Sequence, residues 1–311
     1  MKLIRVSTFV MAIALSFSTV CTAKESSDSV VLPIEPLVGS WSFSGMVANE
    51  NGDLYGYFFQ MQRQGMSFHV KTALIDGQTN QLKLFYEGNE LIQQPAPLNW
   101  HVGRSFMRYN PINDSWVFGV KSEGERGFNF KVDMLKQASD DTHALILRPG
   151  MELQALQTSR LNGHLQTGPD SKEQFVTGNN AWFAKVWISK KQDSSHDIST
   201  TFCRLRNDNG FYSANLKEAD ATGAAIAGWR DPAGNRVKMS QFVSVKSLEN
   251  NQCLLDVVLP KLQLQVMNTL KQEEKAPLSV AGFSKDNKGF CFVTEQSFAQ
   301  IQEAAVSVAA G

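Results

Sequence analysis

Residues 179–189 read NNAWFAKVWIS, and the stretch has the period of two that is typical of a β-strand. One face is wholly apolar and consists of Trp182, Ala184, Val186 and Ile188. The other face consists of Phe183, Lys185 and Trp187. Two large rings are more than a solvated strand surface should hold. We therefore expect the second face to meet a ligand, a substrate or another layer of protein.

The same alternation recurs along the chain and is interrupted by turn signals. Residues 66–74 and 128–134 alternate apolar and polar side chains, and Asn51-Gly52 and Asp76-Gly77 are typical turn dipeptides. Short strands with such turns predict an all-β, antiparallel fold, closed as a barrel or paired as a sandwich. Helical spacing occurs only over residues 295–309 and predicts a short C-terminal helix.

The chain is long enough for one large domain or two of ordinary size. A weak internal similarity links GMVANENGDLYGYFFQMQR (45–63) with GWRDPAGNRVKMSQFVSVK (228–246), although ordinary hairpins share this pattern. We expect a first β-unit at residues 36–160, a second at 161–297, and a helical tail at 298–311.

The first 23 residues have the pattern of a Sec-type signal peptide. Lys2 and Arg5 precede an apolar run at residues 6–20, and Cys21-Thr22-Ala23 offers small residues to a signal peptidase. The run is shorter than the ~20 residues of a membrane-spanning helix, so no stable span is expected. We expect cleavage after Ala23 and a periplasmic or secreted protein. A lipoprotein with a lipidated Cys21 is the alternative.

Three cysteines follow the expected cleavage site: Cys203, Cys253 and Cys291. An exported protein can form one disulfide from them. The sequence leaves two alternatives open, buried free thiols or a Cys253–Cys291 bridge. No CxxC is present and the five histidines are scattered, so no metal site is predicted.

The charges are balanced, with 30 Lys and Arg against 30 Asp and Glu. This balance argues against nucleic acid or an anionic membrane surface as a partner. The chain contains neither a GxSxG nucleophile motif nor a GxxxxGK[ST] phosphate loop. No cofactor is therefore predicted.

Two histidines are candidates for acid–base chemistry. His69 lies on the polar face of an expected strand, and His101 follows Trp100. Either imidazole could point into a barrel cavity and act as an acid or a base. A structural histidine with satisfied hydrogen bonds is the more common alternative.

Aromatic residues on several expected strands are the candidates for binding a ligand. These candidates are Trp41, Tyr57, Phe59, Trp100, Phe183 and Trp187. Barrels of about eight strands can hold one small ligand in a mostly apolar cavity. For any single one of these residues, filling the core is the alternative role.

The segment GSWSFSGMVANENGDLYGYFFQMQR (39–63) resembles the opening hairpin of the lipocalin-like AttH / carotenoid 1,2-hydratase family. The pattern is carried by Trp41, Phe43, Gly45, Gly52, Gly56, Tyr57, Phe58 and Phe59. Later segments follow in the family's order: LNGHLQTG (161–168), NNAWFAKVWIS (179–189), TTFCRLRNDNGF (200–211), AGWRDPAGNRV (227–237) and LDVVLPKLQLQV (255–266). The resemblance covers about residues 36–294 and implies two consecutive lipocalin-like (calycin) antiparallel β-barrel units.

Enzymes of that family hydrate or cyclise double bonds of isoprenoid or polyketide substrates, and other members are exported proteins without an assigned reaction. The resemblance implies an acid and a histidine on the strand equivalent to residues 181–188. Here the corresponding positions are Ala184, Lys185 and Val186, and the family's Glu-Trp-Trp is reduced to Gly39-Ser40-Trp41. A lysine does not readily protonate a double bond, so these differences favour binding over catalysis and leave enzymatic activity open.

The sequence thus predicts an exported lipocalin-like protein that binds a lipophilic small molecule, a lipid or isoprenoid, in an aromatic-lined cavity. A hydratase- or cyclase-type enzyme of the same fold is one alternative, and an extracellular protein-interaction module is another. The sequence makes no prediction of the oligomeric state.

Overall fold

The computed structural model describes most of the chain between residues 36 and 298. The described residues are 36–121, 126–134, 144–190, 195–218, 221–231, 236–239, 241, 243–249, 252–259, 261–268, 270, 279–285 and 289–298. The expected signal peptide at residues 1–23 lies outside them. All the described residues belong to one compact unit.

The described residues form strands and turns without a helix, which confirms the predicted all-β fold. The first sheet has thirteen strands: β1 (Val38–Asn49), β2 (Leu54–Gln64), β3 (Ser67–Asp76), β4 (Leu82–Leu91), β5 (Asn99–Val102), β6 (Ser105–Asn110), β7 (Ser115–Val120), β8 (Gly127–Asp133), β9 (Leu145–Arg148), β10 (Met151–Gln157), β11 (Arg160–Gln166), β12 (Gln174–Asn179) and β13 (Trp182–Ile188).

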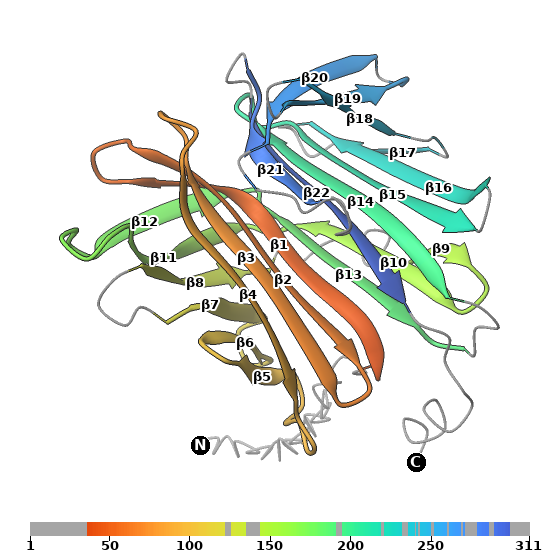
Figure 1. Cartoon of the computed structure of the whole chain (residues 1–311), viewed down its shortest axis with the longest axis horizontal. Helices are drawn as coiled ribbons and strands as arrows, with labels where there is room; N and C mark the ends of the chain where they lie inside the picture. Colours follow the sequence, from red (N-terminus) through yellow and green to blue (C-terminus); the bar gives the residue numbers. More distant parts are fainter. Residues whose placement is uncertain are drawn as a thin grey trace, which may run out of the picture. The chain divides into compact units, whose positions relative to one another are not determined.

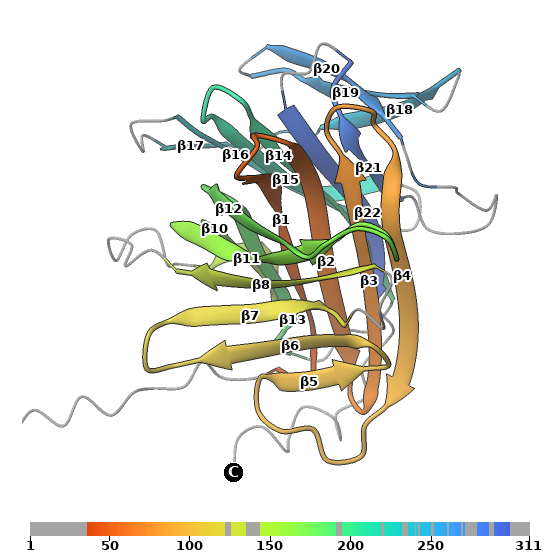
Figure 2. The ribbon, with the colours of Figure 1, turned by 90° about the vertical axis from the view of Figure 1, so that its left-hand side faces the viewer.

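The first sheet is antiparallel and curls into a nearly closed barrel in the order β4-β3-β2-β1-β12-β11-β8-β7-β6-β5 (Figures 1 and 2). Its two end strands, β4 and β5, are joined through side chains. The Tyr86 hydroxyl donates to the Val102 carbonyl oxygen at 3.4 Å, and the Gly103 amide donates to Glu90 at 2.9 Å. Closure in this way leaves few strand edges exposed.

Strand β1 is long enough to serve two branches of the first sheet. It pairs with β2 from Val38 to Ala48. On its other edge, residues 39–44 pair with β13 and residues 48–49 pair with β12. Strand β13 pairs in turn with β10, which pairs with β9. The stretch NNAWFAKVWIS therefore contains the central strand of the branch β1-β13-β10-β9.

The described residues after β13 form two smaller sheets, whose strands pair in the orders β17-β16-β15-β14-β22-β21 and β18-β19-β20 (Figure 1). Their strands are β14 (His196–Leu205), β15 (Gly210–Glu218), β16 (Ala221–Arg230), β17 (Arg236–Met239), β18 (Ser244–Leu248), β19 (Gln252–Val257), β20 (Leu262–Met267), β21 (Ser279–Phe283) and β22 (Gly289–Phe298). A bridge between Val266 and Ser284 links the two sheets.

The buried apolar side chains form three clusters. One fills the interior of the first barrel and includes Trp41, Phe43 and Phe118. A second, which we call the inter-sheet layer, lies between the outer face of the first sheet and the six-stranded sheet. The third is shared by the six-stranded and three-stranded sheets and includes Phe211 and Leu255.

The inter-sheet layer is held by close aromatic packing. The rings of Phe58 and Phe292 stack with their centroids 4.0 Å apart. The ring of Phe290 packs onto Gly56, where an added Cβ would lie 2.2 Å from the ring. The buried indole N–H of Trp182 donates to the Cys203 carbonyl oxygen at 2.9 Å. Gly56 is thus required by the close approach of the second sheet.

Both faces of β13 are used. Trp182, Ala184, Val186 and Ile188 belong to the inter-sheet layer, whereas Phe183 belongs to the barrel interior. Since successive side chains of a strand point to opposite sides, Lys185 and Trp187 also lie on the interior face. The face of β13 that carries Phe183, Lys185 and Trp187 therefore meets the barrel interior and not the six-stranded sheet.

Two predicted boundaries require correction. Strands β11 to β13 pair with β8 and β1, so the first sheet continues to Ile188 and the boundary expected between residues 160 and 161 falls inside it. Residues 295–298, where the sequence predicts the start of a helix, are the end of β22 and pair with β14. Strand pairing here overrides the weak helical spacing. The remainder of the expected tail, residues 299–311, lies outside the described residues.

The cysteine pairing also differs from both alternatives left open by the sequence. Cys203 and Cys291 face each other on β14 and β22 and form a disulfide, while Cys253 on β19 is buried and free. The Cys203 and Cys291 Cα atoms are 4.1 Å apart. The partner is decided by strand register, which brings together residues 88 apart in the sequence.

Among the described residues, none lies in a helix that is both long and apolar enough to cross a membrane.

Candidate ligand site in the first barrel

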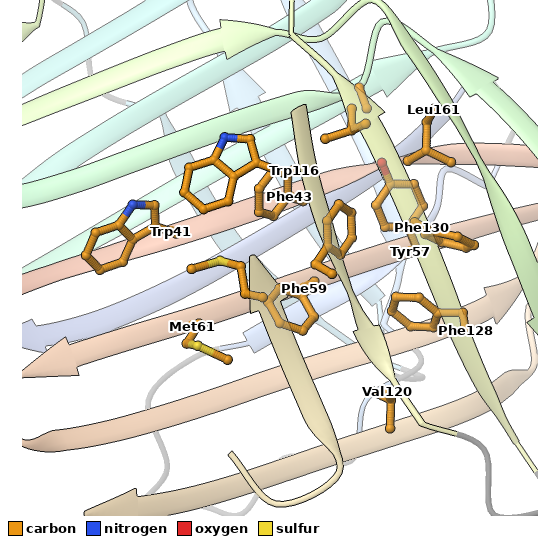
Figure 3. Close-up of a cluster of buried hydrophobic side chains, with 14 of the residues drawn as sticks. Trp41, Phe43, Tyr57, Phe59, Met61, Trp116, Val120, Phe128, Phe130 and Leu161 are labelled. Atoms are coloured by element: carbon orange, nitrogen blue, oxygen red, sulfur yellow. The ribbon is translucent and has the colours of Figure 1, made fainter. Parts of the chain in front are cut away.

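Five of the six aromatic residues predicted to bind a ligand meet inside the first barrel. Trp41, Tyr57, Phe59, Trp100 and Phe183 are all at least 96% buried and belong to the same apolar cluster. Figure 3 shows Trp41, Tyr57 and Phe59 of this set. The strand register explains this convergence, since Phe43 is paired with both Phe59 and Phe183. The sixth, Trp187, lies on the interior face beside Gly39 and is half-buried.

The rings contact one another closely. The Trp41 and Trp100 centroids are 4.7 Å apart in an edge-to-face arrangement, and Phe43 stacks on Phe118 at 4.2 Å. Phe183 lies 5.1 Å from Phe43. Such contacts stabilise the barrel beyond the burial of apolar area. The side chains themselves occupy this part of the interior.

Two buried polar atoms in this aromatic interior are unpaired. Among the described residues, the Tyr57 hydroxyl and the Trp100 indole nitrogen have no hydrogen-bond partner. Burial raises the pKa of the Tyr57 phenol well above its usual range, so it stays protonated. Both groups are therefore hydrogen-bond donors in an apolar setting, which is unusual and costly.

Lys185 places a positive charge among these rings. Its Nζ atom lies 4.9 Å from the ring centroid of Trp187 and 5.6 Å from that of Trp41. Burial lowers the pKa of Lys185 from 10.5 to about 8, and the carboxylate of Glu152 offsets part of this effect. The indole faces favour a cation while the loss of water disfavours it, and the loss of water prevails.

Arg63 is a second interior cation, which the sequence reasoning missed. It is 93% buried, and its guanidinium lies 5.4 Å from the Phe68 centroid and 6.0 Å from that of Trp100. Its Nε donates to the Gly65 carbonyl oxygen at 2.9 Å. Burial lowers its pKa. The signal was present, since Arg63 continues the period of two that places Tyr57 and Phe59 on the interior face.

The two candidate catalytic histidines do not point into the barrel, which corrects that expectation. His69 alternates with the buried Phe68 and Val70, and its Nε2 lies 2.9 Å from Glu87 on the outer face. Burial lowers the pKa of His69, the hydrogen bond and charge of Glu87 oppose this shift, and the charge of Lys71 adds to it. His101 is exposed and alternates with the buried Trp100.

The positions at which the family resemblance implies an acid and a histidine are divided between two environments. Ala184 and Val186 are buried in the inter-sheet layer, and only Lys185 of the three lies on the interior face. The barrel side of this strand therefore offers a lysine amine and two aromatic rings. Within the described residues, no three His, Cys, Asp or Glu side chains are grouped as a metal site would require.

Comparison with known proteins identifies the fold. No family model matches the sequence, and no curated protein matches it. Among solved structures, a Nitrosomonas europaea protein named as an AttH is 12% identical, with the alignment covering 83% of this chain and 92% of that one at a TM-score of 0.57. Kievitone hydratase from Nectria haematococca is 9% identical over 87% of this chain and 94% of its own, at a TM-score of 0.58.

These similarities extend over most of both chains and confirm at the level of fold what the opening hairpin suggested. The identities are too low to transfer an activity, because one fold hosts many unrelated functions. The chain thus has the lipocalin-like, all-β fold of the AttH and kievitone hydratase structures.

Proposed function

We propose that this chain is an exported lipocalin-like protein that binds a lipophilic small molecule, a lipid or an isoprenoid, in its first barrel. The observation that carries the proposal is the aromatic interior with two unpaired donors, the Tyr57 hydroxyl and the Trp100 indole N–H. A buried donor without a partner costs about 1–3 kcal/mol. An apolar ligand with a carbonyl or hydroxyl oxygen would offset that cost.

Exposure along β13 indicates where the ligand would enter. Phe183 is 96% buried, whereas Lys185 and Trp187, towards the end of the same strand, are half-buried. Because the deeper rings are in mutual contact, binding requires the side chains at this end to move apart. The long, flexible Lys185 side chain is suited to such a movement, and export is proposed on the pattern of residues 1–23.

Binding is favoured over catalysis by the chemistry of β13. A hydratase needs a strong acid beside the double bond, and the interior face of this strand carries Phe183, Lys185 and Trp187 instead. The two candidates for acid–base chemistry, His69 and His101, lie on the outer face of the first sheet.

The test is to purify the protein from the periplasm, to examine it by native mass spectrometry, and to extract it with organic solvent. We expect a retained apolar molecule at one copy per chain. A fluorescence titration with Nile red, which is apolar and carries a carbonyl, then measures affinity. Trp100→Phe should weaken Nile red binding about fivefold, which corresponds to the loss of one hydrogen bond worth about 1 kcal/mol.

Trp229→Phe is the matched control, because Trp229 packs against the third cluster and not in the first barrel. It should leave Nile red binding unchanged. A protein that retains no apolar molecule and does not bind Nile red would overturn the proposal. Equal weakening by both substitutions would place the binding site elsewhere.

A further inference from the structure

A groove of about 510 Å³ lies on the outer face of β5–β8 and β11. These strands lie next to one another in the first sheet (Figure 2). Most of its lining residues alternate along the strands with the buried ones, while Val120, Phe128 and Leu165 of the interior cluster form its inner wall. His101 and Phe106 line it, whereas Trp100 and Met107 point inward.

The floor of the groove is set by the strand register. Across four adjacent strand pairs, His101 is opposite Phe106, Phe106 opposite Gly119, Gly119 opposite Asn129, and Asn129 opposite His164. Gly119, in the middle of this row, has no side chain. An added Cβ there would lie 2.0 Å from the Phe128 carbonyl oxygen, so the close approach of β7 and β8 requires glycine at this position.

The lining combines an aromatic surface with an excess of basic groups. The half-buried ring of Phe106 lies 6.3 Å from that of His101. Among the lining residues that the structure describes, Arg108 and Lys121 are cationic and Glu173 is the acidic one. His101 and His164 add hydrogen-bonding nitrogen atoms. Phe106 and Arg108 are two residues apart on β6 and therefore lie on the same face of that strand, and a ring and a guanidinium on one face suit an anionic group joined to an apolar ring.

We propose that this groove is a second binding site, for a small organic anion that joins a carboxylate or phosphate to an apolar ring. Arg108 holds the anionic group, the ring packs against Phe106 and Val117, and Asn129 donates a hydrogen bond. This proposal does not rest on lipophile binding in the barrel interior.

Nuclear magnetic resonance titrations of the isotope-labelled full chain test the proposal with four probes. These are benzoate, phenyl phosphate, benzyl alcohol and inorganic phosphate. Benzoate or phenyl phosphate should shift the Gly119 and Asn129 amide signals saturably, and whichever binds more tightly identifies the preferred anion. Benzyl alcohol lacks the charge and inorganic phosphate lacks the ring, so each should bind at least tenfold more weakly.

Arg108→Gln should weaken binding of the better probe at least tenfold. Arg160→Gln is the matched control, because Arg160 is on the same sheet, is exposed and does not line the groove. Equal weakening by both substitutions would show that overall surface charge causes the effect, and this would overturn the proposal. Three other results would also overturn it: no saturable shift with either aromatic anion, shifts confined to the barrel interior, or inorganic phosphate binding as tightly as phenyl phosphate.

Discussion

Lys185 carries its ammonium group between two indole rings at the half-buried end of the barrel interior. The rings attract a cation, yet the lost hydration outweighs them and the pKa falls to about 8. A lysine of this kind changes charge in a range where ordinary lysines stay protonated. The residue is therefore sensitive to mild alkalinity.

We predict that Lys185 makes stability depend on pH between about 8 and 10.5. In this range the unfolded state binds more protons than the folded state, so the free energy of unfolding rises with pH. Lys185→Met removes this contribution. The variant should have a higher free energy of unfolding than the wild type at pH 7.5, and this difference should be smaller at pH 10. Urea unfolding at both values measures the effect, with Lys172→Met, at an exposed position, as the control.

Direct titration of a ¹³C-methylated Lys185 amine would provide a second measurement. A midpoint near 10.5, or the same pH dependence in the wild type and in Lys185→Met, would contradict the assignment of a desolvated lysine.

At the scale of elements, the pairing of β14 with β22 joins two segments far apart in the chain. His196–Leu205 pairs along its whole length with residues 289–298, and the Cys203–Cys291 disulfide lies within this ladder. The same two strands supply Phe202 and Phe292 to the inter-sheet layer. The disulfide therefore links the two strands of the six-stranded sheet that come first and last in the sequence.

We predict that the chain left by the proposed cleavage after Ala23, denatured without a reductant, exposes one reactive thiol, that of Cys253. Peptide mapping should find Cys203 linked to Cys291. Replacing both with alanine should lower the free energy of unfolding by about 4 kcal/mol, because the bridge closes a long loop in the unfolded chain. Cys253→Ala, at the buried free cysteine, is the control and should cost far less. Recovery of a peptide linked through Cys253 would show that the pairing differs.

At the scale of the whole described molecule, the inter-sheet layer couples the first sheet to the six-stranded sheet. Phe58 and Phe292 stack across it, and Phe290 packs onto Gly56. Each sheet would expose a large apolar face without the other. Exposed faces of this kind are unfavourable in water, so neither sheet is expected to be stable alone.

We predict a single cooperative unfolding transition for the two sheets. Gly56→Ala should destabilise both by about 1–3 kcal/mol, because the added methyl overlaps the Phe290 ring and the packed layer can yield only in part. Hydrogen exchange in β7 and in β15 should report the same loss. Gly168→Ala is the control, since a Cβ there meets no atom within 4 Å. Separate unfolding transitions in β7 and β15 would show that the inter-sheet layer does not couple the two sheets.

The local features of the fold could be predicted from the sequence. The alternation around Phe68 and Phe130 indicated strands, and Asn51-Gly52 indicated the turn between β1 and β2. The same alternation placed Trp41, Tyr57 and Phe59 together as candidates, and they do meet. These predictions succeeded because a strand's two-residue period is a local property.

The environment of each face could not be predicted in this way. Alternation separates two faces without indicating which one meets the barrel interior, and for β13 both are buried. His69 and His101 lie outside for the same reason, and the partner of Cys291 depended on which strand lies beside β22. The change of sheet after Ile188 likewise depends on pairing between β1 and strands more than a hundred residues later.

The sequence by itself determined the all-β class, the main strands and turns, and the aromatic residues of the first barrel, because each follows from local periodicity and from the burial of apolar side chains. The tertiary structure alone decided three further things. It placed Lys185 on the barrel side of β13, it assigned Ala184 and Val186 to the layer between the sheets, and it formed the groove beside Phe106 and Arg108. These depend on register and on packing between distant strands, and a linear pattern does not carry that information.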